Sequence, residues 1–203
     1  KVKANGRFGE GDRLVLDLVA EPDGDVFDAD LRIDAPAGGV ITSFANLDGD
    51  YVARLDGDGT WSEWAGDLAV NRNGESLARF KLSLDDGTYG IKGLADTSPF
   101  LNGIPQRALG PDTRIEASGT FADRVIDGRL ELLGQGIGLV AQGAADLADN
   151  RADDVEFAAT LRDPQLFGDS FRFEGAEATG TIDGSFRDLS IPFRLTANRF
   201  SAG

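Results

Sequence analysis

The chain has 203 residues, a formal net charge of -15, and no cysteine, histidine or methionine. The negative charge argues against a nucleic-acid partner and against electrostatic docking on an anionic membrane, since both present phosphate groups. The missing cysteine excludes a disulfide framework, and the missing histidine removes the commonest general base and metal ligand, so we expect no catalytic centre, no metal and no cofactor.

Segments in which apolar and polar residues alternate run through the whole chain. Because successive side chains of a strand point to opposite faces, each segment predicts a strand with one apolar and one charged face. Parallel strands buried on both faces would read as solid apolar runs, so we expect an all-β, mostly antiparallel fold. In chain order the segments are 12–20, 26–35, 76–84, 113–121, 155–162, 170–174 and 191–197.

Asp-Gly pairs stand between and within these segments. This pair suits tight hairpin turns, because both residues tolerate a positive φ. A turn signal every 8 to 15 residues or so is typical of all-β architectures. The pairs lie at 23–24, 48–49, 56–57, 86–87, 127–128 and 183–184.

The only two tryptophans of the chain, Trp61 and Trp64, lie just before a predicted strand. A bend or bulge between them would put both on one side of the sheet. We interpret them as side chains that cover the edge of the apolar face. The functional alternative is an aromatic platform that binds sugars.

The segment 98–112 interrupts the alternation. Pro99 suits the first position of a helix, while Gly103 and Pro105 keep any helix short. We expect one short helical connector near 99–109, which gives the chain a soft division near 98–112. The glycines of 134–143 stand in a strand pattern and predict strong curvature of the sheet.

Acidic residues offer candidates for catalysis or metal binding, but their contexts argue against both. The adjacent pairs 85–86 and 153–154 are expected to be solvated, since a working carboxylate pair needs a shared pocket. The acids of 56–63 lack the spacing of an EF-hand calcium loop. An enzyme is therefore the least expected class of protein.

Three stretches resemble a recurring unit of the translocation and assembly module TamB family, which belongs to the AsmA-like group of large Gram-negative envelope proteins. They are GDGTWSEWAGDLAV (57–70), SLARFKLSLDDGTYGIKG (76–93) and IDGRLELLGQGIGLVAQGAADLADNRADDVEFAATLRDPQLF (126–167). Within them, a G-x-W-x-x-W-x-G pattern lies at Gly59, Trp61, Trp64 and Gly66, and the phrase GAADLADNR lies at 143–151.

The resemblance implies that residues 1–203 are a single periplasmic segment of a longer protein anchored in the inner membrane. The implied fold is a β-taco, a strongly curved sheet that forms a U-shaped trough with an apolar lining. The implied function is phospholipid transport from the inner to the outer membrane through this hydrophobic groove. A role in outer-membrane protein assembly, with a TamA-like outer-membrane barrel as partner, is also implied.

If the apolar strand faces line such a trough, phospholipid acyl chains take the place of a second protein layer. The residues expected to line the groove are Leu14, Leu16, Leu18, Phe27, Leu31, Ile33, Phe80, Leu82, Leu84, Ile115, Phe121, Leu130, Leu132, Ile137, Leu139, Val155, Phe157, Leu161, Phe171, Phe173, Ile182, Phe186, Ile191, Phe193 and Leu195.

The alternation alone does not separate this trough from a closed β-sandwich, because both need one apolar face per strand. A closed sandwich would act as a binding module for carbohydrate, or as an adhesin, through its loops. A further alternative is a scaffold for nascent outer-membrane protein strands. There the apolar face would contact polypeptide and not lipid.

Overall fold

A computed structural model describes residues 1–8, 11–168 and 171–202. The chain divides into two compact units, Lys1–Gly87 and Thr88–Gly203. In both units the strand pairings within the unit are antiparallel. The segment 98–112 lies within the second unit.

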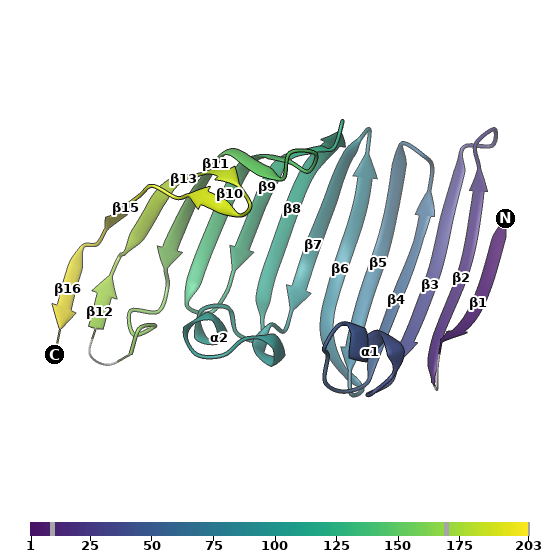
Figure 1. Cartoon of the computed structure of the whole chain (residues 1–203), viewed down its shortest axis with the longest axis horizontal. Helices are drawn as coiled ribbons and strands as arrows, with labels where there is room; N and C mark the ends of the chain where they lie inside the picture. Colours follow the sequence, from purple (N-terminus) through teal and green to yellow (C-terminus); the bar gives the residue numbers. More distant parts are fainter. Residues whose placement is uncertain (9–10, 169–170, 203) are drawn as a thin grey trace. The chain divides into compact units, whose positions relative to one another are not determined.

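The first unit is a sheet in which each strand pairs with the next one in the chain, in the order β1 to β6 (Figure 1). Its elements are β1 (Val2–Phe8), β2 (Asp12–Glu21), β3 (Val26–Ala35), α1 (Val40–Phe44), β4 (Tyr51–Gly59), β5 (Glu63–Arg72) and β6 (Glu75–Asp85).

The second unit follows the same plan from β7 to β11, after which β13 takes the next place and pairs with β14 and β15. Strands β12 and β16 form a separate small sheet. The elements are β7 (Thr88–Ala95), the 3-10 helix η1 (Ser98–Phe100), α2 (Ile104–Leu109), β8 (Thr113–Ala122), β9 (Val125–Leu133), β10 (Ile137–Asp146), β11 (Arg151–Leu161), β12 (Phe171–Glu174), β13 (Glu177–Ser185), β14 (Asp188–Ser190), β15 (Phe193–Thr196) and β16 (Arg199–Ala202).

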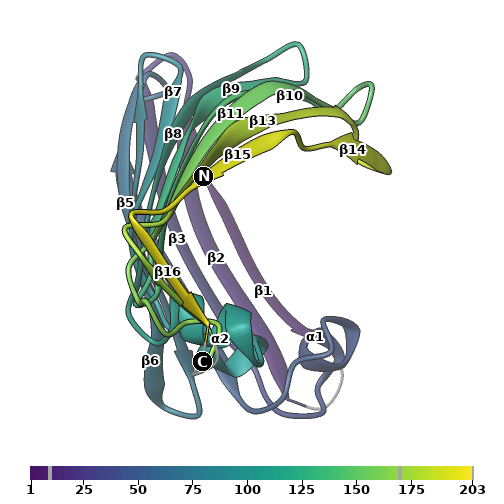
Figure 2. The ribbon, with the colours of Figure 1, turned by 90° about the vertical axis from the view of Figure 1, so that its left-hand side faces the viewer.

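The predicted fold class is confirmed. The chain is nearly all antiparallel β-structure with two short α-helices among the described residues. Figure 2 shows how strongly β9, β10, β11 and β13 bend along their length. The predicted glycine-linked distortion lies at Gly143, whose φ is 150°, where the pairing of β10 with β11 shifts register between Gln142 and Ala144. Two residues of β11, Asp154 and Val155, stand opposite Gly143 there, and an extra residue of this kind increases strand bending and twist.

The helical connector predicted near 99–109 is confirmed as η1 and α2. Helix α2 lies at one end of the strands of its unit (Figure 1) and packs on the turn 134–136. There the N–H of Gly136 donates to the carbonyl of Ala108 at 2.9 Å, and a Cβ on Gly134 would lie 2.6 Å from Cα of Leu109. These glycines therefore allow the helix to approach closely.

Helix α1 was not predicted. It begins after Gly39, and its first turn is capped by Asp12, a residue from β2. The fully buried carboxylate of Asp12 accepts the N–H of Val40 at 2.5 Å and that of Ile41 at 3.4 Å. This contact satisfies backbone donors that a short helix leaves open.

Three of the predicted Asp-Gly turns are wrong. Asp56-Gly57, Asp127-Gly128 and Asp183-Gly184 lie inside β4, β9 and β13. Turns with positive φ instead lie at Asn73-Gly74 and Asp123-Arg124. Gly57 and Gly128 lie on the apolar faces described next.

Candidate functional site

The first unit presents one continuous apolar face, here called the first face. Residues directly opposite each other in neighbouring strands share a face of the sheet. One row across β2 to β6 is Leu16, Leu31, Leu55, Leu68 and Phe80. All the groove residues predicted for this unit lie on the first face: Leu14, Leu16, Leu18, Phe27, Leu31, Ile33, Phe80, Leu82 and Leu84.

The second unit has its own apolar face, the second face. One row across β8 to β15 is Ala117, Leu130, Ala141, Phe157, Gly180 and Phe193. The predicted groove residues on this face are Ile115, Phe121, Leu130, Leu132, Ile137, Leu139, Val155, Phe157, Leu161, Ile182, Phe193 and Leu195.

The remaining predicted groove residues lie off these strands. Phe173 belongs to the small β12–β16 sheet, where its ring packs 5.8 Å from that of Phe167. Phe186 and Ile191 are exposed and lie beside β14, outside its bounds. The side chain of Phe171 lies outside the described part of the structure.

Neither face is sealed into a conventional core. Among the described residues the buried apolar side chains are Ala35, Tyr51, Ala108, Ala152, Leu166 and Ala176, most of them small. The leucines and phenylalanines of the rows are half-buried or exposed, and Phe193 is 64% exposed. Soluble proteins rarely leave contiguous apolar surface open without using it for binding.

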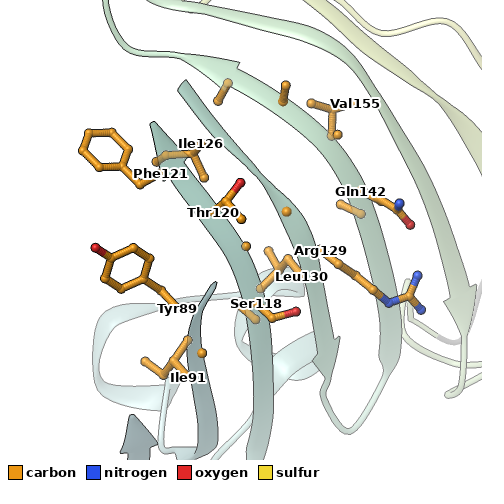
Figure 3. A pocket seen from close by; sticks show the side chains of 18 residues that line it. Tyr89, Ile91, Ser118, Thr120, Phe121, Ile126, Arg129, Leu130, Gln142 and Val155 are labelled. Atoms are coloured by element: carbon orange, nitrogen blue, oxygen red, sulfur yellow. The ribbon is translucent and has the colours of Figure 1, made fainter. Parts of the chain in front are cut away.

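Two hollows lie on the second face. One has a volume of about 610 Å³ and is bounded by Tyr89, Ile91, Phe121, Ile126 and Leu130, among others. Figure 3 shows the rings of Tyr89 and Phe121 on one side of these strands and the polar ends of Arg129 and Gln142 turned away from them.

The other hollow, of about 430 Å³, lies where the small β12–β16 sheet faces the main sheet of this unit. Phe167 and Phe173 bound it on one side, and Ile137, Leu161 and Leu195 bound it on the other. Both hollows lie within the size range of small-molecule sites, and their linings are mostly apolar.

Sequence reasoning missed several members of the two faces: Leu55, Leu68, Val70, Tyr89, Ile91 and Ile126. The missed signal was present in YVARL (51–55) and TYGIK (88–92), which alternate like the segments that were recognised.

The tryptophans take part in an aromatic cluster with a residue distant in sequence. The ring of Phe27 lies 4.8 Å from that of Trp61 and 6.3 Å from that of Trp64, measured between centroids. Trp64 lies in β5 on the first face, and its Nε1 is buried with no hydrogen-bond partner among the described residues. Trp61 lies in the turn before β5 and is 47% exposed.

The opposite face of the first unit is charged. A row of acids, Asp17, Asp30, Asp56 and Asp67, crosses β2 to β5 and ends on Lys3 and Lys81. The ammonium of Lys3 lies 2.5 Å from Asp17, and that of Lys81 lies 3.2 Å from Asp67. The hydrogen bond from Lys3 is the largest cause that lowers the pKa of Asp17.

The middle of this row has no lysine. A hydrogen bond between the Asp30 and Asp56 side chains, together with partial burial and charge repulsion, raises the pKa of Asp30 above its ordinary value. In β3, the guanidinium of Arg32 binds Asp34 at 2.6 Å and lowers the pKa of that carboxyl. The pairs made by Lys3, Lys81 and Arg32 offset part of the charge repulsion on this acidic face, which lies on the side away from the apolar face.

No family model, curated protein or solved structure matches the chain. Within the described ranges, no group of three or more acidic, histidine or cysteine side chains is placed to hold a metal ion. In the same ranges, no helix is both long enough and apolar enough to cross a membrane.

Proposed function

We propose that the apolar faces bind the acyl chains of phospholipids, and that the chain is a periplasmic segment of a TamB-like protein that moves phospholipid between the inner and outer membranes. The observation that carries the proposal is the pair of apolar rows, such as Leu16 to Phe80, whose large side chains are half-buried or exposed among the described residues. The family assignment itself draws on the sequence resemblance.

The energetics favour an aliphatic ligand. Each CH₂ group removed from water contributes about 0.8 kcal/mol, so a long acyl chain gains on the order of 10 kcal/mol. Leu, Ile and Phe side chains on a bent sheet give many similar contacts along a row and few polar ones. Such a lining suits passage of a chain along the face better than tight retention at one point.

The charged face supports the same proposal. The net charge of -15 keeps a protein with open apolar surface in solution and discourages self-association. Phospholipid headgroups would remain in water beside the sheet. Free strand edges offer a route by which further β-segments, or a TamA-like outer-membrane barrel, pair with the chain during outer-membrane protein assembly.

Site-specific photocrosslinking tests this proposal. A photoreactive residue at Leu82, Phe157 or Phe193 faces the proposed ligand. The matched controls are the adjacent positions Lys81, Glu156 and Arg194, which lie on the opposite faces of the same strands. After expression in a Gram-negative host, lipid extraction and mass spectrometry should find phospholipid adducts at the first three positions only.

Equal labelling of the two sets, or no adduct at Leu82, Phe157 and Phe193, would refute acyl-chain binding. Adducts of those positions with polypeptide and not with lipid would favour the scaffold for nascent outer-membrane strands. Native mass spectrometry of the purified chain gives an independent measure, because a retained phospholipid adds its own mass to the protein.

A further inference from the structure

Two hairpins, one in each unit, share the same layout on their apolar faces. In β4–β5, Gly57 lies directly opposite Gly66, and Trp64 stands two residues before Gly66. In β8–β9, Gly119 lies directly opposite Gly128, and Ile126 stands two residues before Gly128. The spacing along the chain is also the same, so Ile126 takes the place of Trp64.

In the first hairpin the indole covers the glycine pair. A Cβ on Gly57 would lie 2.8 Å from Cε2 of Trp64, and a Cβ on Gly66 would lie 2.9 Å from Cζ2 of the same ring. Both distances are too short for real atoms, so the ring lies directly against the backbone of the two glycines. The chain therefore shows that a fused aromatic ring can cover a pair of opposed glycines. Such a glycine surface is here called the floor.

In the second hairpin the glycine surface is wider. The three atoms nearest to a Cβ built on Gly119 or Gly128 are all backbone atoms, while Val155 packs against Gly143. Gly128 lies opposite Gly119 on one side and opposite Gly143 of β10 on the other, so three strands contribute a glycine at the same level. All three border the 610 Å³ hollow. The strands are tightly apposed here, since a Cβ on Gly119 would lie 2.9 Å from Cα of Gly128.

Large side chains surround this floor without covering it. Tyr89 and Phe121 are each 52% exposed and Ile126 is 44% exposed, although all three border the hollow (Figure 3). Aromatic rings favour offset or edge-to-face contacts with another ring. The hollow therefore combines a flat floor of backbone with two rings at its rim.

We propose that this hollow binds a flat, fused-ring, uncharged group of a lipid-soluble small molecule, which covers Gly119 and Gly128 as the indole of Trp64 covers Gly57 and Gly66. The inference depends on the proposed function, because it uses the same open apolar face, and it adds a ligand class to acyl chains. The guanidinium of Arg129, which borders the hollow, turns away from it and binds Glu131 at 2.7 Å, so this acidic chain disfavours an anionic ligand there.

The test uses the uncharged naphthalene probe N-phenyl-1-naphthylamine, whose fluorescence rises in an apolar site. Ile126→Trp places an indole over the glycine floor and should weaken the tightest probe binding about tenfold. Leu133→Trp, on the opposite face of the same strand and 43% exposed, should leave it unchanged. Far-ultraviolet circular dichroism and thermal melts of both variants establish that they fold alike.

A second variant keeps the test decisive if Ile126→Trp disturbs folding. Tyr89→Ala removes one exposed ring from the rim and should weaken probe binding several-fold. Competition then identifies the ligand shape: menadione, a flat bicycle, should displace the probe, while dodecanol, a flexible chain, should displace it far less.

Equal probe affinity in Ile126→Trp and Leu133→Trp would overturn the inference. Equal displacement by dodecanol and menadione would overturn the fused-ring assignment but leave acyl-chain binding intact. Failure of the proposed function is recognised separately, by the absence of phospholipid adducts at Leu82, Phe157 and Phe193.

Discussion

The indole ring of Trp64 lies on Gly66, its neighbour two residues along β5. The three atoms nearest to a Cβ built on Gly66 all belong to this ring, and Gly66 itself has an ordinary strand conformation. Glycine is therefore required at this position by the ring and not by the backbone. The same relationship explains why the tryptophan and the glycine occur together in the pattern W-x-G.

Replacing Gly66 with alanine should destabilise the chain. The added methyl group must displace the ring from its place on the first face, and overpacking of this kind costs about 1–3 kcal/mol. The free energy of unfolding from urea titrations, followed by circular dichroism, measures the effect.

The same substitution in a Trp64→Ala background supplies the control. Without the ring, alanine at position 66 has room and restricts the unfolded chain, so it should be neutral or stabilising by about 0.4–1 kcal/mol. A loss of the same size in both backgrounds would mean that the ring does not determine the requirement for glycine.

Alternation along the sequence predicted much of this architecture. It placed residues such as Leu16, Leu31 and Phe80 on apolar strand faces, and Pro99 marked the connector that contains α2. The register is different in kind, because it depends on which residues meet across strands. Alternation within one strand therefore did not predict that these three residues lie in one row with Leu55 and Leu68.

Two other features depend on contacts distant in sequence. Helix α1 is capped by Asp12, which stands 28 residues before Val40, so the local sequence carries no capping signal. Asp56-Gly57 and Asp127-Gly128 have the composition of hairpin turns but lie in strands. There Gly57 makes room for Trp64, and Gly128 allows close approach to Gly119. Tertiary packing overrides turn propensity at these positions.

The row of acids on the charged face of the first unit predicts that Asp56→Asn stabilises the chain, by an amount that depends on pH. The pKa of Asp30 is raised in the folded chain, so the free energy of unfolding falls as pH rises from the ordinary value of 3.8 through the raised one. At neutral pH the two carboxylates repel across the strands. An amide at position 56 removes this repulsion and can donate to Asp30, so the melting temperature at neutral pH should rise.

Asp67→Asn is the matched control for Asp56→Asn. It removes the same charge from the same row, but it also breaks the 3.2 Å ion pair with Lys81. Its melting temperature at neutral pH should rise less than that of Asp56→Asn. Equal gains from the two variants would show that total charge, and not the Asp30–Asp56 contact, determines the effect.

The Arg32–Asp34 pair predicts the opposite pH dependence. The hydrogen bond from Arg32 lowers the pKa of Asp34, so its contribution to stability is present above the ordinary aspartate value and is lost as pH falls through the lowered one. Arg32→Gln should raise the pKa of Asp34 toward 3.8, as measured by carboxyl carbon NMR. Arg13→Gln removes only a weaker charge effect from across the strands, so a shift as large as that of Arg32→Gln would contradict this assignment.

The cap on α1 gives a prediction for Asp12. Asp12→Ala leaves the N–H groups of Val40 and Ile41 without their acceptor in a buried place, which should lower the free energy of unfolding by about 1–3 kcal/mol. Asp12→Asn keeps a side-chain oxygen there and should lose less. Hydrogen exchange should accelerate at Val40 and Ile41 in the alanine variant, while amides of β5 and β6 keep their rates. Uniformly faster exchange across the first unit would instead mean that Asp12 supports the whole sheet and not this helix alone.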